Sequence, residues 1–223
     1  MRPALLILSA FALPAPALAQ ACIGTPIPEG QTLAAGVFGF GEGFRDYGLA
    51  IVGNRQSPWS LGASISAQRF PEAPVIDDVR GTALEVMAAF ETYRTAITQT
   101  RGPDTPVSGC ITGTFGVRRV KGRASALHDL GTTARATSVE LGYGLGVLVA
   151  DTPENRVAVY AWPRLVVTWA EAEAGGESDT ESRAEPALAL GAAFHLGALL
   201  IGGEVGIARE EWAFGLRIGL TLF

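Results

Sequence analysis

Large apolar side chains alternate with small or polar ones along most of the chain. The clearest case is the segment 212–223, WAFGLRIGLTLF, where Trp212, Phe214 and Leu216 begin a series of apolar residues at every second position. Successive side chains of a β-strand point to opposite faces, so this period of two indicates a strand with one apolar face. The same period predicts ten strands: Thr32–Gly41, Asp46–Val52, Trp59–Gln68, Thr82–Arg94, Val107–Val117, Thr137–Ala150, Arg156–Thr168, Ala187–Leu196, Leu199–Ala208 and Trp212–Phe223.

Two of the predicted strands leave an alternative open. In the first, Leu33, Ala35 and Val37 compete with Phe38 and Phe40 for the apolar face. The fourth alternates well, but its alanine, leucine, glutamate and methionine residues also favour a helix, which stays open for that segment.

The connections divide into a mostly short and a mostly long set. If the chain enters from the periplasm, the periplasmic turns are Gly53–Pro58, Ala96–Pro106, Asp151–Asn155 and His195–Ala198. The outer loops are Gly41–Arg45, Arg69–Gly81, Arg118–Arg135, Trp169–Pro186 and Ala208–Glu211. Such asymmetry is typical of outer-membrane barrels, which have an even number of strands. Eight strands is the alternative to ten.

Three features favour a membrane barrel over a soluble β-sandwich. The inner-face residues are mostly glycine, alanine and serine, which suits a narrow lumen. Tyr47, Trp59, Trp169 and Trp212 fall near strand ends, where aromatic girdles lie. Closure by the last strand would remove the edges that so apolar an open sheet would expose. The pattern therefore predicts an all-β, antiparallel, up-and-down transmembrane β-barrel.

The chain also resembles a known family. The glycine-rich strands, the segment VSGCITGTFGV around Cys110, the segment RVAVYAWPRLVVTW and the ending WAFGLRIGLTLF are similar to the small bacterial outer-membrane β-barrel proteins, porin-like or opacity-type. The resemblance covers almost the whole mature chain and rests on patterns instead of fixed residues. It implies a barrel in the outer membrane, inserted by the barrel assembly machinery, and it assigns no activity and no functional residue.

The N-terminus has the features of an export signal. Arg2 supplies a positive charge, residues 5–13 are apolar, and Ala17 and Ala19 stand at the cleavage spacing. We therefore expect a signal peptide at 1–19, a periplasmic segment at 20–31 and the barrel at 32–223. The net charge of −5 argues against a nucleic-acid partner.

Two cysteines in an exported chain suggest one disulfide. Cys110 faces inward near the periplasmic start of its strand, and Cys22 lies just before the first strand at the same end. A Cys22–Cys110 bond would hold the N-terminal segment as a partial plug, and it would contribute roughly 2–4 kcal/mol. No cluster of further ligands accompanies the cysteines, so we expect no metal and no cofactor.

Charged residues on the predicted inner face are the main candidate site. They are Glu85, Glu91, Glu140, Arg156, Arg164, Glu204 and Arg217. A buried charge is costly unless it is paired, so these groups should pair or stay hydrated. We expect ion pairs and small side chains to close the lumen largely, because narrow barrels are just wide enough for side chains to fill. A selective pore is the alternative.

One pair of loop residues is a weaker candidate. Ser125 and His128 lie three residues apart in an outer loop, and some outer-membrane barrels modify lipid A with a serine and a histidine near the outer face. A triad needs defined geometry as well as residue types, so the default is a solvated loop. His195 lies in a predicted turn and receives no role.

Two charged segments complete the candidates. Glu171–Glu185 is acidic and poor in apolar residues, so we expect a mobile surface loop. The basic cluster of Arg118, Arg119, Lys121 and Arg123 is a candidate contact for lipid phosphates.

Together these observations predict a non-catalytic outer-membrane barrel with a structural or surface-interaction role and with outer-membrane lipid and lipopolysaccharide as its partners. A small passive pore is the first alternative, and a lipid A-modifying enzyme is the second. The sequence does not indicate the oligomeric state.

Overall fold

A computed structural model of the 223-residue chain describes residues 30–41, 44–54, 58–70, 76–97, 104–124, 131–152, 155–174, 177–208 and 211–222. The predicted signal peptide, Cys22, Ser125 and His128 lie outside these residues. Within the described ranges, no helix is long and apolar enough to cross a membrane.

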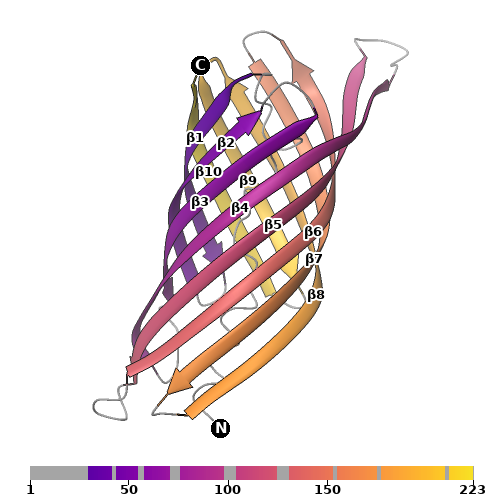
Figure 1. The fold of residues 1–223 in the computed structure, drawn as a ribbon. Helices are drawn as coiled ribbons and strands as arrows, with labels where there is room; N and C mark the ends of the chain where they lie inside the picture. Colours follow the sequence, from indigo (N-terminus) through magenta and orange to yellow (C-terminus); the bar gives the residue numbers. More distant parts are fainter. Residues whose placement is uncertain are drawn as a thin grey trace.

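Ten antiparallel strands form one closed barrel (Figure 1). Each strand pairs with its neighbours in sequence, and β1 pairs with β10 to close the ring. The strands are β1 (Thr32–Gly41), β2 (Phe44–Asn54), β3 (Trp59–Phe70), β4 (Ile76–Ile97), β5 (Thr105–Ala124), β6 (Gly131–Asp151), β7 (Asn155–Ala174), β8 (Glu177–Leu196), β9 (Leu199–Ala208) and β10 (Glu211–Leu222). The predicted ten-stranded up-and-down barrel is confirmed. The eight-strand alternative and the helix at Thr82–Arg94 are both wrong.

The two ends of the barrel need names. We call the end where β10 finishes at Leu222 the C-terminal rim; there β2 is joined to β3, β4 to β5, β6 to β7 and β8 to β9. The opposite rim joins the remaining neighbours, from β1–β2 to β9–β10. In Figure 1 the C-terminal rim is at the top.

Five strands are at least seven residues longer than the sequence pattern predicted. β4 to β8 contain 20–22 residues each, whereas a tilted strand crosses a bilayer in about 9–11 residues. The predicted loops Arg118–Arg135 and Trp169–Pro186 are mostly strand, because β5 and β6 extend toward each other, as do β7 and β8. Beyond an apolar belt both faces of a strand can be polar, so alternation of hydrophobicity no longer marks it.

The acidic segment Glu171–Glu185 is part of this extension. Its two halves pair in register, with Glu171 opposite Thr180 and Glu173 opposite Ser178. The prediction of a mobile loop was therefore wrong, and the segment is a β-hairpin.

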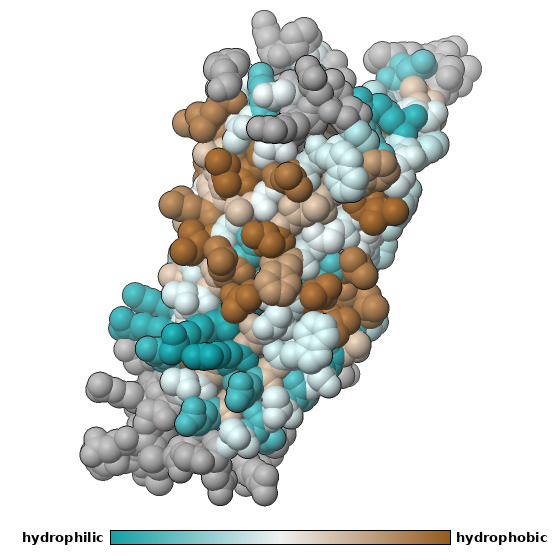
Figure 2. Space-filling view, in the orientation of Figure 1, coloured by the Kyte–Doolittle hydropathy of each residue, from teal (hydrophilic) through white to brown (hydrophobic). Residues whose placement is uncertain are grey.

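The barrel has an apolar outside and a mixed inside. Leucine, isoleucine, valine and aromatic side chains are exposed on the outer face of every strand, and Tyr47, Trp59, Trp169 and Trp212 are among them. Figure 2 shows these side chains as a broad apolar band. The open facing of β1 is now settled, because Leu33 and Val37 are buried inside while Phe40 is exposed.

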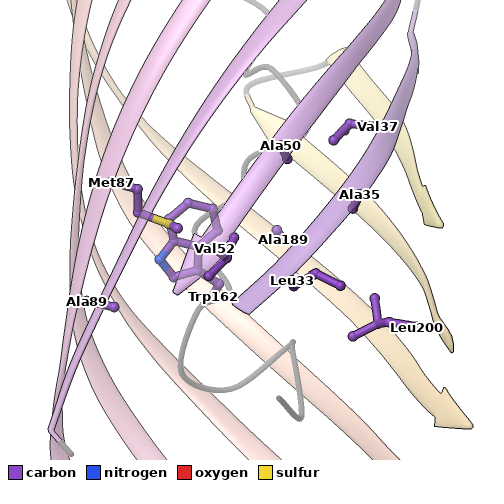
Figure 3. Close-up of a cluster of buried hydrophobic side chains, with 10 residues drawn as sticks. All are labelled: Leu33, Ala35, Val37, Ala50, Val52, Met87, Ala89, Trp162, Ala189 and Leu200. Atoms are coloured by element: carbon purple, nitrogen blue, oxygen red, sulfur yellow. The ribbon is translucent and has the colours of Figure 1, made fainter. Parts of the chain in front are cut away.

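Part of the inside is apolar as well. Trp162, Met87, Val52, Leu33 and Leu200 lead a cluster of buried side chains drawn from β1, β2, β4, β7, β8 and β9. Figure 3 shows Met87 and Val52 gathered at Trp162, with Leu33 and Leu200 further along the wall. Leu33, Val52 and Leu200 lie close to the C-terminal rim, so apolar groups line part of the lumen at that end.

Candidate functional site

The polar half of the lumen is built from inward side chains of β2 to β10. Its charged members are Asp46, Glu85, Arg118, Glu140, Arg164, Glu185, Glu204 and Arg217. All but Arg118, which is half-buried, are buried. Carboxylates outnumber guanidinium groups in this set, so the lumen has an acidic character.

Tyr160 connects three strands of the lumen wall. Its hydroxyl donates to Glu204 Oε2 at 3.1 Å and accepts from Arg217 Nη2 at 3.3 Å. The ring reaches β9 from β7 by lying over Gly191 of β8, where a Cβ would collide with the hydroxyl. Glycine at this position therefore allows the contact between Tyr160 and Glu204 to form.

Trp162 reaches in the opposite direction from the same strand. Its Nε1 donates to Thr112 Oγ1 at 2.8 Å, and its side chain crosses Gly142 of β6, where a Cβ would meet the indole nitrogen. The guanidinium of Arg164 lies over the ring at 4.1 Å from its centroid. A cation over an indole face is attracted by the ring quadrupole, so Arg164 and Trp162 fix each other's position.

Arg164 also forms the central ion pair of the lumen. Its Nε lies 3.6 Å from Glu140 Oε2, and the two side chains are 1% and 6% exposed. Arg164 interacts electrostatically with Glu85 and Glu204 as well. Among the described residues, Nη1 of Arg164 and Nη1 of Arg217 have no hydrogen-bonding partner. Charges this deep need further donors or acceptors, and water molecules in the lumen would supply them.

A second polar group lies around Asp46. Gln68 Nε2 donates to Asp46 Oδ2 at 3.3 Å, and Arg118 interacts with both Asp46 and Glu85. Arg118 was predicted to lie in a basic surface cluster, but it occupies the inner face of β5 in phase with Thr112 and Thr114. That part of the prediction was wrong because the predicted strand ended at Val117, whereas β5 continues to Ala124.

Five of the seven predicted lumen charges come together in this network: Glu85, Glu140, Arg164, Glu204 and Arg217. The other two lie toward the C-terminal rim. Glu91 Oε1 accepts from Arg94 Nε at 2.9 Å, and Arg156 pairs in register with Asp151 of β6 and His195 of β8.

The sequence-based set of lumen candidates lacks several residues of the network, namely Asp46, Tyr160, Trp162 and Glu185, and Arg118 was assigned to the surface instead. A signal for most of them was present, because each alternates in phase with other inward residues of its strand. Glu185 lay in a segment predicted as a loop, so the alternation could not assign its side chain to the inner or outer face.

The cysteine and histidine candidates have different outcomes. Cys110 is fully buried on β5 beside Tyr160, and the predicted disulfide to Cys22 stays a prediction because Cys22 is outside the described residues. His195 belongs to the end of β8, where its Nε2 lies 3.3 Å from Thr221 Oγ1. The tight turn itself is at Gly197, whose φ of 60° suits glycine.

Candidate metal-binding clusters are absent from the part of the chain that the structure describes. No group of three or more histidine, cysteine, aspartate or glutamate side chains there is arranged to hold an ion.

Comparison with known proteins supports the fold. No protein-family model and no curated protein matches the sequence. The translocator domain of the autotransporter NalP from Neisseria meningitidis has a TM-score of 0.50 at 12% identity, over 86% of this chain and 88% of that chain. The β-domain of the Bordetella autotransporter BrkA scores 0.39 at 16% identity, over 86% and 99%. The N-terminal β-barrel domain of OprF from Pseudomonas aeruginosa scores 0.37 at 8% identity, over 87% and 98%. This chain therefore shares the barrel fold of the NalP translocator domain.

Proposed function

We propose that this protein is a non-catalytic outer-membrane β-barrel with a structural or surface-interaction role in the cell envelope. An N-terminal signal peptide exports it, and its own side chains largely close its lumen. Outer-membrane lipid surrounds the barrel wall.

The observation that carries the proposal is the inverted distribution of side chains. Leu49, Leu61 and Leu141 are 68%, 61% and 61% exposed on the outer face, whereas Glu140 and Arg164 are each 5% exposed inside. Burial of apolar surface stabilises by about 25 cal/mol per Å², so an apolar band around a whole barrel is unfavourable in water. In a bilayer the same band is favourable, and a closed barrel leaves no unpaired strand edge.

Packing inside the barrel supports a largely closed lumen. Tyr160 and Trp162 lie across Gly191 and Gly142 of the neighbouring strands, so large rings fill the space that glycines leave. The ion pair between Arg164 of β7 and Glu140 of β6 adds two more buried side chains inside the barrel. The apolar cluster around Trp162 adds further buried side chains to the part of the lumen toward the C-terminal rim (Figure 3).

The first test is gel mobility of the purified protein in SDS, boiled against unboiled, together with cell fractionation. A closed membrane barrel stays folded in SDS until it is heated, so we expect a band shift and recovery from the outer membrane. Soluble periplasmic protein with no shift would contradict the proposal and would favour a secreted β-sandwich.

A small passive pore is the second candidate, and one observation favours it. Buried polar atoms such as Thr114 Oγ1 and Arg217 Nη1 have no partner among the described residues, which favours water in the lumen. Planar-bilayer recordings separate the two candidates. We expect no conductance above background from the wild-type protein, and steady conductance steps would support the pore.

A further inference from the structure

A row of basic side chains crosses the outer face of the barrel near the opposite rim. Arg45 of β2 pairs in register with Arg69 of β3, Arg69 with Arg80 of β4, and Arg80 with Lys121 of β5. All four residues are exposed. They are far apart in the sequence, and only the barrel register makes them neighbours. We call these four residues the basic row.

The neighbouring outward positions change from basic to apolar over a short distance. On β5, the residue two positions from Lys121 toward the middle of the barrel is Arg119, which pairs in register with Arg135 of β6. Four residues along each strand from the basic row, the outward positions of β2 to β5 are all apolar. They form one continuous row, which we call the apolar row: Leu49, Ile65, Leu84 and Val117. In Figure 2, hydrophilic side chains gather on the left, directly below the apolar band.

Adjacent like charges on a sheet repel each other. Residues directly opposite on neighbouring strands have Cβ atoms about 4.5–5.5 Å apart, and like charges there are destabilising. Within the described part of the chain, Arg45, Arg69, Arg119 and Lys121 form no ion pair. A bound anion would convert this repulsion into attraction.

We propose that the basic row binds the phosphate groups of a phosphorylated glycolipid of the outer leaflet, whose acyl chains pack against the apolar row. Three strand spacings separate β2 from β5, so the row is about 14 Å wide. That width matches a headgroup with two phosphates on a disaccharide better than a lipid with one phosphate. Arginine suits this role because its guanidinium binds phosphate oxygens in a bidentate manner.

The inference rests on the proposed membrane location and adds an orientation to it. The opposite rim, where the basic row lies, faces the outer leaflet and the cell exterior. The row also replaces the predicted cluster of consecutive basic residues, since Arg118 points inward and the row takes Arg45, Arg69 and Arg80 from other strands.

Native mass spectrometry of the folded full-length protein in an uncharged detergent tests the proposal. Lipid A with two phosphates is titrated first, and dephosphorylated lipid A and phosphatidylglycerol follow as comparison lipids. We expect lipid A to bind most tightly and its binding to weaken as salt increases. The loss of each cation should weaken binding about fivefold, so the double variant Arg45→Gln/Lys121→Gln should bind lipid A about 25-fold more weakly.

The matched control is Arg94→Gln/Arg183→Gln, which removes the same charge away from the row. Arg94 lies toward the C-terminal rim and Arg183 on the inner face of β8 beside Glu181. Equal lipid A binding by the two double variants would overturn the proposal. Equal binding of dephosphorylated lipid A, or of phosphatidylglycerol, would overturn it as well.

Gel mobility of the same variants keeps this inference separate from the proposed function. A retained heat-dependent shift shows that the variant still forms a closed barrel. The absence of a heat-dependent shift in the wild-type protein would instead contradict the proposal of a membrane barrel.

Discussion

Replacement of Trp162 by alanine tests whether the lumen is held closed by packed side chains. The indole is only 2% exposed, its Nε1 donates to Thr112, and Arg164 lies over its face. It is also the largest member of the apolar cluster that lies inside the barrel toward the C-terminal rim. Its removal should destabilise the barrel and open a path through it.

The size of the effect follows from these contacts. Truncation of a buried tryptophan to alanine costs about 3–5 kcal/mol in a dry core. Water can enter the lumen and hydrogen-bond to Thr112 and Arg164. We therefore expect the free energy of unfolding to fall by about 3 kcal/mol, near the lower end of this range. Trp162→Phe keeps most of the packing and loses the bond from Nε1 to Thr112, so its loss should be about 1 kcal/mol.

Urea titration of the protein in lipid vesicles measures the stability, with the unboiled gel band as the readout of folded barrel. A loss of about 3 kcal/mol lowers the midpoint by about 1.5 M for an m-value of about 2 kcal/mol per molar. Planar-bilayer recordings measure the lumen, and Trp162→Ala should show conductance steps that the wild-type protein lacks.

Trp169→Ala is the matched control, because Trp169 lies on the same strand with its side chain 47% exposed on the outer face. It should not change the conductance. A stability loss below about 1 kcal/mol for Trp162→Ala, with no conductance, would refute the view that this indole closes the lumen.

Three further predictions concern other parts of the molecule. Gly191→Ala places a Cβ against the Tyr160 hydroxyl, so it should displace the ring from Glu204 and cost about 2 kcal/mol in the same urea titration. Denatured, unreduced protein should resist alkylation by iodoacetamide and gain two carbamidomethyl groups only after reduction, because Cys22 and Cys110 are the two cysteines of the chain. Expression of wild-type protein and of His128→Ala should give identical lipid A mass spectra.

Each of these predictions has a defined contrary result. Gly203→Ala is the control for Gly191→Ala, since the nearest atom to its Cβ would be Phe214 Cζ at 4.0 Å, and equal losses would contradict the steric argument. Alkylation of both thiols without reduction would exclude the disulfide. A lipid A mass change that depends on His128 would contradict the non-catalytic proposal.

The strands with an apolar outer face were predictable from the sequence because large apolar side chains recur there at every second position. β10 shows this pattern along its whole length and β3 shows it as far as Ala67, and the predicted bounds of both strands differ from the observed ones by few residues. β1 was ambiguous because its inner face is also apolar. Leu33 and Val37 pack in the lumen with residues of distant strands, and no local pattern contains that information.

The extended hairpins and the lumen contacts were harder to predict. Around Glu171–Glu185 neither face of the strands carries a series of large apolar side chains, so the composition resembles a loop although the backbone pairs. Alternation correctly assigned Glu204 and Arg217 to the inside. It could not indicate that Tyr160 would join them, because that contact depends on a glycine of β8 that lies between the partners.

The alternation along the hairpin of β7 and β8 affects which of its side chains an antibody can reach. Along β8, Ser178, Thr180 and Ser182 point outward, whereas Asp179, Glu181 and Arg183 alternate with them on the inner face. A free peptide of this segment displays all its side chains, but the folded hairpin presents only one alternate set on its outer surface. Antibodies raised against the native protein should therefore recognise conformational epitopes that boiling destroys.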